Sequence, residues 1–515
     1  MVVHAHVYTV DNEFSVAEAF VVIDGKITAT GTTEEIQQKY IAEKTLDLQG
    51  KTVFPGLIDA HAHFFGLGLQ QQKVDLTGTK SFEEVLERIV EFQKKHQVSY
   101  ITGRGWDQND WVVKEFPDKW MLDSLFPETP VAITRIDGHA LLANQKALDL
   151  AGISPESSVE GGKVEISNGK LTGILIDNAM ELVRNSIPKP SREEATAALL
   201  AAQKICLDYG LTTVDDAGLN KEVIQLMDSL QKTGDLKIRI YAMAGATPEN
   251  VDFYLEHGTV KTVRLNVRSF KVYADGALGS RGAVLKEPYS DKPHHFGTML
   301  IGVDEFKKLA GRIHNSKFQM NTHAIGDSAN VVVLKTYDSL LNESEDRRWR
   351  VEHAQIIDEG DFNYFSKNII PSVQPTHATS DMYWAEDRLG PERIKNAYVF
   401  QKLLKQAGII ALGTDFPVEK VSPFLTFYAA VARKDLKGFP EGGFQPENAL
   451  SREKTLKGMT IWAAYANFEE KEKGSLEPGK FADFVVLNQD IMEVEASKIP
   501  ETKVIATYIS GEKVN

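Results

Sequence analysis

Four histidines and one aspartate at the ends of apolar segments are the residues of this 515-residue chain best suited to chemistry. His61 and His63 are two positions apart in PGLIDAHAH, so on a strand their side chains share a face and can chelate one ion. His323 lies in NTHA, His353 ends RVEH and Asp415 follows LGT. Imidazole nitrogens and carboxylate oxygens suit zinc best, but also bind manganese, cobalt or iron. These segments predict a divalent-metal site if the fold brings them together.

These residues fall at the ends of β runs that alternate with helical stretches, which is the pattern of parallel βα units. Eight such runs occur, and eight is the number that closes a TIM barrel with units of about 30 residues. Strand ends in a parallel barrel point to a common centre, so distant histidines can meet there. Any one of these histidines alone would be better explained as a satisfied core residue. The runs begin at Thr52, Leu211, Lys237, Val267, Phe318, Arg348, Ile369 and Ile409.

One gap breaks the regular spacing of the runs. Roughly 150 residues separate the first run from the second, far more than one βα unit needs. We therefore predict an inserted α+β subdomain at 66–191 and assign 52–65 with 192–449 to the barrel. Insertions after a barrel strand project from the C-terminal face, so we expect the insert to cover the active site.

The two ends of the chain both have the alternating pattern of β strands. Asp24-Gly25 and Ser510-Gly511 separate alternating segments and indicate hairpin turns. Neither cluster of short strands is large enough to form a core alone, so residues 1–51 and 450–515 are expected to form one β domain.

Composition excludes several classes of protein. A net charge of −14 with no basic patch argues against nucleic-acid or membrane partners, and no apolar run of about 18 residues could cross a membrane. Cys206 is the single cysteine, in a helical segment, and is expected to be a buried thiol. The start MVVHAHVYTV has no secretory signal, which predicts a cytoplasmic protein; a periplasmic one stays open, because a trimmed sequence would look the same.

The motifs PGLIDAHAH, NTHAIGD, VEHAQ, LGTDFPV and SLEPGKFADFVVLN resemble those of the amidohydrolase superfamily. GRGWDQ and RIDGHALLAN are similar to segments of its YtcJ-like, amidohydrolase-3 branch, which includes an N-substituted formamide deformylase. The resemblance covers essentially the whole chain. It implies a TIM barrel with a β-sandwich domain and an enzyme that hydrolyses C–N bonds with one or two divalent metal ions.

The same resemblance implies a further ligand, Lys271 in SFKVYADGAL. In binuclear members of the superfamily, a lysine at the end of the fourth strand is carboxylated by CO₂, and its carbamate bridges two metals. The resemblance implies that His61, His63 and Asp415 bind one metal ion. It implies that His323 and His353 bind a second. The plain alternative for Lys271 is a surface or ion-paired lysine. Carboxylation needs a neutral amine, which burial favours.

The expected mechanism is attack of metal-activated water on an amide-type carbonyl. Asp415 would accept the proton of the water and deliver it to the departing nitrogen. His139 in the insert is a candidate donor to the developing oxyanion, and could equally fix a loop. Substrate-binding candidates, chosen on position alone, are Trp106, Asp107, His139, Arg281 and His377. Each could instead serve packing or an ion pair, and for the tryptophan packing is the favoured reading.

The sequence leaves other functions open. A deaminase or a cyclic amidase could use the same scaffold, because fold and metals do not fix the substrate. A catalytically inactive metal-binding scaffold is the alternative of another class, although every metal position is filled. The predicted partner is a small-molecule substrate; the oligomeric state is open, with a homodimer as the default on frequency alone.

Overall fold

The computed structural model describes residues 1–159, 161–342 and 344–515. The chain divides into two compact units, 1–64 with 202–515 and Phe65–Ala201. The second unit comprises nearly the same residues as the predicted insert. Within the described part of the chain, no helix is both long and apolar enough to cross a membrane.

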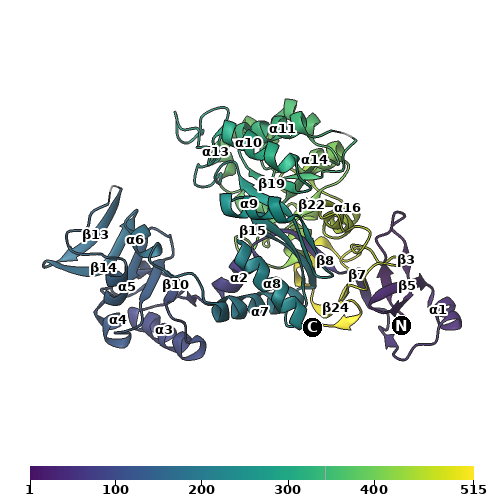
Figure 1. The fold of residues 1–515 in the computed structure, drawn as a ribbon, viewed down its shortest axis with the longest axis horizontal. Helices are drawn as coiled ribbons and strands as arrows, with labels where there is room; N and C mark the ends of the chain where they lie inside the picture. The colour runs from purple at the N-terminus through teal and green to yellow at the C-terminus, as the bar shows by residue number, and fades with distance from the viewer. Residues whose placement is uncertain (160, 343) are drawn as a thin grey trace. The chain divides into compact units, whose positions relative to one another are not determined.

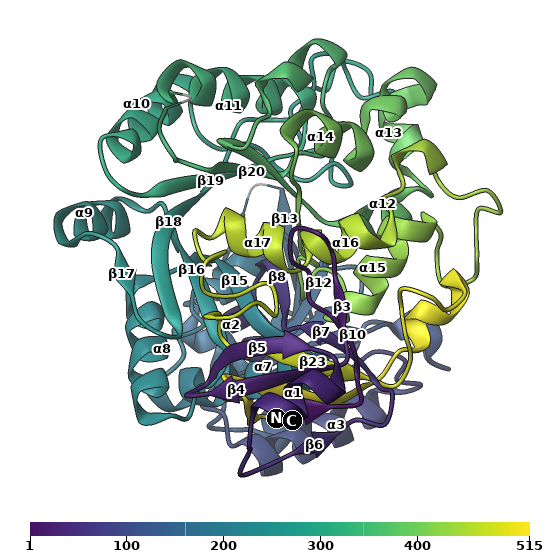
Figure 2. The same cartoon turned by 90° about the vertical axis from the view of Figure 1, so that its right-hand side faces the viewer.

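The first unit contains the predicted barrel, with eight parallel strands in sequential order around a nearly closed ring (Figure 2). Beyond the paired residues of the last strand, the N–H of Asp415 donates to the carbonyl of His61 at 2.8 Å, and the N–H of His63 donates to Phe416 at 2.8 Å. These bonds join the last strand to the first. The fold prediction is confirmed. The strands are β8 (Leu57–Ala62), β15 (Leu211–Leu219), β16 (Arg239–Gly245), β18 (Leu265–Tyr273), β19 (Gln319–Ala324), β20 (Trp349–His353), β21 (Ile369–Val373) and β22 (Ala411–Leu412).

Helices lie outside the barrel strands, as the βα pattern requires (Figure 2). Local sequence sets where these helices begin and end. The Thr247 hydroxyl accepts from the N–H of Asn250 at the start of α9, and Gly234 ends α8 in the left-handed region of φ/ψ space. Cys206 is fully buried on the helix that precedes β15, as predicted. The helices are α7 (Arg192–Asp208), α8 (Lys221–Thr233), α9 (Pro248–His257), α10 (Val303–His314), α11 (Asp327–Leu340), α12 (Pro375–Asp381), α13 (Ala385–Arg393), α14 (Phe400–Ala407), α15 (Pro423–Ala432), α16 (Arg452–Gly458) and α17 (Ile461–Ala466).

Alternation along β8 separates an apolar face from a polar one. Ile58 and Ala60 pack against the alanines of α17, whereas Asp59 and His61 point to the other face, inside the barrel. The predicted boundary of the barrel domain was residue 449. Helix α17 lies after that residue and packs on barrel strands, so the barrel domain extends beyond 449.

The two ends of the chain form two sheets. One has the order β5-β4-β1-β6, and the other, β25-β24-β23-β7-β2-β3, combines strands from both ends, as predicted (Figure 1). Asp24-Gly25 and Ser510-Gly511 both have positive φ angles at the predicted hairpin turns. The strands are β1 (Val2–Val3), β2 (His6–Tyr8), β3 (Val16–Ala17), β4 (Ala19–Ile23), β5 (Lys26–Gly31), β6 (Leu46–Asp47), β7 (Thr52–Pro55), β23 (Phe484–Leu487), β24 (Val504–Ile509) and β25 (Glu512–Lys513), with helix α1 (Thr33–Lys39).

The run predicted as the first barrel strand is divided between two sheets. Its first half, β7, pairs with β2 and β23 in the terminal domain, and only its second half is β8. Gly56 separates them, at a point where a Cβ atom would lie 2.2 Å from Thr212 Oγ1. A buried ion pair joins the domains nearby: Arg239 of β16 donates to both oxygens of Asp483, at 2.6 and 2.9 Å.

The second unit is a six-stranded mixed sheet with short helices. Its sheet order is β13-β14-β12-β11-β10-β9, and its core includes Trp106, Trp111 and Ile133. The insert is thus the predicted α+β subdomain, with six strands. They are β9 (Val74–Asp75), β10 (Ile101–Trp106), β11 (Val131–Arg135), β12 (Ala140–Ala143), β13 (Gly162–Ser167) and β14 (Lys170–Asp177), with helices α3 (Phe82–His96), α4 (Trp120–Leu125), α5 (Gln145–Leu150) and α6 (Met180–Arg184), and α2 (Phe64–Gln70) at the start.

Candidate functional site

The two histidines of the HxH motif lie at the end of β8 with fixed ring orientations. His61 is fully buried, and its Nδ1 lies 2.5 Å from Glu352 Oε2. His63 Nδ1 lies 3.0 Å from the carbonyl oxygen of Ala217. A carboxylate or carbonyl oxygen can only accept, so each Nδ1 carries the proton and each Nε2 keeps its lone pair. Both lone pairs are therefore available to a metal ion.

His323 is the last residue but one of β19 and His353 ends β20, and their rings pack edge to face with centroids 4.5 Å apart. The centroids of His353 and His61 are 5.0 Å apart. His323 Nε2 and His353 Nδ1 are buried and have no hydrogen-bond partner. Since buried polar atoms are nearly always paired, two unpaired imidazole nitrogens in one place are what a missing metal would leave. The backbone of His353 has φ 71°, a left-handed conformation that is costly for a non-glycine residue.

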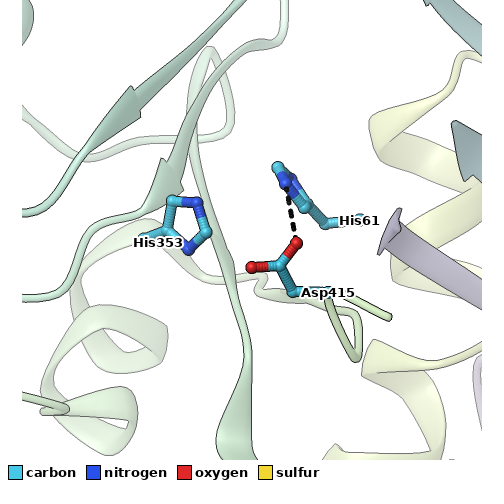
Figure 3. A group of neighbouring side chains, drawn as sticks. All are labelled: His61, His353 and Asp415. Carbon is cyan, nitrogen blue, oxygen red and sulfur yellow. Dashed lines mark ion pairs between the residues drawn. The ribbon is translucent and has the colours of Figure 1, made fainter. Parts of the chain in front are cut away.

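Asp415 completes the group from the segment after β22. Its Oδ1 lies 3.3 Å from His63 Nε2 and 3.8 Å from His61 Nε2, yet has no hydrogen-bond partner. One ligand atom each from His61, His353 and Asp415 lie within 4.8 Å of one another (Figure 3). The φ of Asp415 is 61°, so this aspartate also has a left-handed backbone. Donor types and spacing together fit a divalent ion.

Burial keeps the imidazoles neutral, which is the form that binds metal. Burial and the nearby Lys271 amine lower the pKa of His61 to about 4 and of His323 to about 3. Burial likewise holds the pKa of His353 well below its ordinary value. Burial would raise the pKa of Asp415, but hydrogen bonding to His377 and the contact with His63 outweigh it and keep the carboxylate ionised.

Lys271, near the end of β18, lies inside this group. Its Nζ is 3.0 Å from His61 Nε2 and 4.9 Å from the ring centroid of Tyr273. Burial lowers the pKa of the amine to about 8, although Glu352 and Asp415 oppose the shift. The surface-lysine alternative is therefore wrong, because Lys271 is 1% exposed.

Sequence reasoning missed the charged network beneath these residues. The carboxylate of Glu352, whose Oε2 contacts His61, also accepts from Arg350 Nε at 2.8 Å, and Arg350 Nη1 donates to Asp215 at 2.9 Å. Asn467 binds both Arg350 and Asp215. All of these side chains are fully buried. The available signal was alternation: charged residues at every second position of an otherwise apolar strand point into the barrel.

Burial would raise the pKa of Glu352, but Arg350 and His61 outweigh that effect and lower it to about 2. Glu352 is thus a carboxylate that holds the HxH histidine in one tautomer. Such carboxylate–histidine pairs are the usual support of a metal ligand.

His377 follows β21 and links two carboxylates. Its Nε2 lies 3.2 Å from Asp415 Oδ2, and its Nδ1 lies 3.2 Å from Glu419 Oε1. Ser380 also donates to Glu419, at 2.5 Å. Burial would lower the pKa of His377, but the two carboxylates raise it to about 10. His377 was predicted as a substrate contact; the structure places it as a hydrogen-bond partner of Asp415, and substrate contact stays a prediction.

Other predicted substrate residues have structural partners. Arg281 pairs with Asp291 through two bonds of 3.1 and 2.7 Å. Within the second unit, Trp106 is fully buried and its indole N–H donates to the carbonyl of Ile133 at 3.0 Å, so packing explains its place there. Substrate binding by these residues stays a prediction.

Asp107 and His139 also belong to the second unit. Asp107 pairs with Arg135 at 2.6 Å and caps a short 3₁₀ helix, Gln108–Asp110. His139 is exposed, and its Nδ1 lies 2.8 Å from Asp177 Oδ1. Its predicted contact with an oxyanion, and the expected cover of the active site by the insert, stay predictions.

A model of the Amidohydro_3 family, described as an amidohydrolase family, matches residues 44–515. Protein LONG AFTER FAR-RED 3 of Arabidopsis thaliana is 34% identical, over 100% of this chain and 91% of its own. YtcJ of Bacillus subtilis (strain 168) is 31% identical, over 99% and 98% of the two chains. The N-substituted formamide deformylase of Arthrobacter pascens is 27% identical, over 99% and 97%.

A solved structure of similar fold is that of an uncharacterized metal-dependent hydrolase from Pyrococcus horikoshii OT3. Its TM-score is 0.82 at 28% identity, over 96% of this chain and 98% of that one. Because this match extends over nearly all of both chains, it includes the barrel, the terminal domain and the insert.

Proposed function

The chain belongs to the amidohydrolase family, and from this premise we propose that it hydrolyses a non-peptide, amide-type C–N bond by metal-dependent activation of water. One observation carries the proposal. Unpaired ligand atoms of Asp415, His323 and His353 lie with the Nε2 lone pairs of His61 and His63 at the ends of four barrel strands. In TIM barrels, this end of the strands is where active sites are built.

The residues present fit one or two divalent ions, with zinc as the proposed metal. His61, His63 and Asp415 would hold one ion, and His323 and His353 would hold the other. A bound divalent metal supplies Lewis acidity and lowers the pKa of water in its coordination sphere.

Electrostatics favours the carboxylated form of Lys271. An ammonium beside four imidazoles would repel a cation, and the lysine charge already lowers the pKa of both His61 and His323. Carboxylation replaces that positive charge with a negative one. Burial has shifted the pKa of the amine to about 8, so about a tenth of it is neutral at pH 7 and can react with CO₂.

Asp415 is the proposed general base and acid. His377 holds its Oδ2, so its Oδ1 remains directed toward the two histidines of the HxH motif. A carboxylate fixed in this way can take a proton from the attacking water and return it to the nitrogen of the breaking bond, which needs protonation to leave. Glu352 has a supporting role, because it holds the ring of His61.

The proposed substrate is an N-substituted, N-acyl or N-formyl amide. Support comes from the full-length similarity to the N-substituted formamide deformylase of Arthrobacter pascens. The test is an activity screen of zinc-reconstituted protein with N-formyl amines, N-acyl amino acids, cyclic amides and aminated heterocycles. Turnover of the last two groups alone would favour a cyclic amidase or a deaminase instead.

One variant separates a loss of catalysis from a loss of bound metal in this screen. Asp415→Asn should retain most of the metal and lose nearly all turnover, because an amide cannot accept the proton. Full activity of Asp415→Asn with metal bound would reject the role of Asp415. A wild-type protein that neither contains metal nor takes it up would support the alternative of an inactive scaffold.

A further inference from the structure

Asn321 of β19 is a buried amide with nothing to bind. Its side chain is fully buried, and neither Oδ1 nor Nδ2 has a hydrogen-bond partner. Among the asparagines and glutamines that the structure describes, it alone has both amide atoms buried and unpaired. Burying an amide without hydrogen-bond partners costs free energy. The partners of Asn321 are therefore expected to come from a group that the unmodified protein chain does not contain.

Strand register shows what Asn321 lies beside. Its Cα is in register with Lys271 of β18 on one side and with Arg350 of β20 on the other. Asn321 and His323 are two positions apart, so they share the inner face of the barrel. The donors of Arg350 are engaged by Glu352, Asp215, Asn467, Ser372 and the carbonyl of Ala60. Of the two neighbours, Lys271 is therefore the one whose chemistry can still change.

Carboxylation of Lys271 would supply the groups that the amide lacks. The neutral amine attacks the carbon of CO₂, an N–C bond forms, the electron pair of one C=O bond moves to oxygen, and a proton leaves the nitrogen for solvent. The product keeps one N–H donor on Nζ and gains two acceptor oxygens. An asparagine amide offers one acceptor oxygen and two N–H donors, which is the complementary set.

We propose that Asn321 is a positioning residue for the carboxylated form of Lys271, its Oδ1 accepting from the carbamate N–H and its Nδ2 donating to a carbamate oxygen. The inference rests on the proposed function, since it requires that Lys271 be carboxylated. It assigns to Asn321 no contact with the substrate. An amide that pairs with the carbamate stabilises it against loss of CO₂ and fixes the plane in which its oxygens lie.

The test measures the carbamate directly. Full-length protein is stripped of metal and then reconstituted with zinc and ¹³C-labelled hydrogencarbonate, and the carbamate is quantified by ¹³C NMR beside the zinc content. The variants are Asn321→Leu, which is similar in size and cannot hydrogen-bond, and Asn321→Asp, which cannot donate and repels a carbamate. Ser269→Ala is the matched control, because this buried, unpaired hydroxyl lies two residues before Lys271 on the same strand face.

Wild type and Ser269→Ala should each show one carbamate signal, and both should be carboxylated at the same hydrogencarbonate concentration. Asn321→Leu should need about tenfold more hydrogencarbonate for half-carboxylation, the effect of losing roughly one hydrogen bond, and Asn321→Asp should need at least as much. If the leucine variant does not fold, the nearly isosteric aspartate variant still gives the answer.

Two results would overturn the inference, and they differ in what else they remove. Carboxylation of both Asn321 variants at the wild-type concentration rejects the role of Asn321 and leaves the proposed function intact. A wild type that binds zinc without any carbamate signal rejects the inference together with the carboxylated lysine of the proposed function.

Discussion

Replacement of Glu352 by glutamine should weaken metal binding without a change in any ligand. Glu352 is fully buried and accepts from two donors, His61 Nδ1 at 2.5 Å and Arg350 Nε at 2.8 Å. A glutamine of the same shape has one acceptor oxygen, so its NH₂ group must face one of those donors. The ring of His61 then loses either its partner or its fixed tautomer.

The expected magnitude follows from the role of Glu352 as a support of a ligand. Loss of such a partner typically lowers metal affinity by about 10- to 100-fold, or about 1.4–2.7 kcal/mol. The assay is a zinc titration of the stripped protein against a chromophoric chelator. Arg350 keeps its bond to Asp215, so we expect the variant to fold.

Asp483→Asn is the matched control for this experiment. Asp483 is also a buried carboxylate that accepts from an arginine, Arg239, but it lies in the terminal domain. Its variant should lose stability and keep wild-type zinc affinity. Equal zinc affinity of Glu352→Gln and wild type, or an equal loss in both variants, would refute the reasoning.

Three further predictions concern residues around the site. The rate of zinc reconstitution at a fixed concentration of dissolved CO₂ should rise about tenfold per pH unit and level off above about pH 8, because deprotonation of Lys271, whose pKa is about 8, produces the reactive amine; a rate independent of pH would contradict this. Glu419→Ala should lower kcat about tenfold with little change in KM, because His377 loses the hydrogen-bond partner of its Nδ1. Glu419→Gln should restore most of kcat. An unchanged kcat in the alanine variant would argue against a role of Glu419 in holding His377. Gly413→Ala should bind less zinc and have a lower melting temperature, because its Cβ atom would lie 2.5 Å from a backbone nitrogen of β8. The control is Gly442→Ala, which has open space around it and should match wild type in zinc content and in melting temperature.

Barrel strands could be predicted because their signal is local. Each run is a short apolar segment followed by a helical one, and the count of eight fixes the closure. The candidate ligands could be picked out because they occupy one recurring place, the end of a run. Convergence of His61, His353 and Asp415 then follows from topology and needs no knowledge of side-chain rotamers.

Features that depend on contacts across the barrel could not be predicted from the sequence. Glu352 and Arg350 lie within three positions of His353, but the partner of Glu352, His61, is 291 positions away and the partner of Arg350, Asp215, is 135 positions away. Pairing over such distances is set by register. The split of the first run at Gly56 depends on the close approach of Thr212, which no local pattern reveals. The left-handed backbones of His353 and Asp415 are likewise consequences of tertiary structure.

The charged interior of this barrel is itself an argument for function. Asp59, Asp215, Arg350 and Glu352 are fully or almost fully buried inside the barrel. A buried ion pair is often no more stable than a hydrophobic replacement, so stability alone does not explain a network of this size. Burial even raises the pKa of Asp59 and Asp215 to about 7, which means that their ionised forms are costly in the folded protein. The cost makes sense if the network fixes His61 and balances the charge of bound cations, and an apolar replacement of Arg350, Glu352 and Asp215 together should then fold and fail to bind metal.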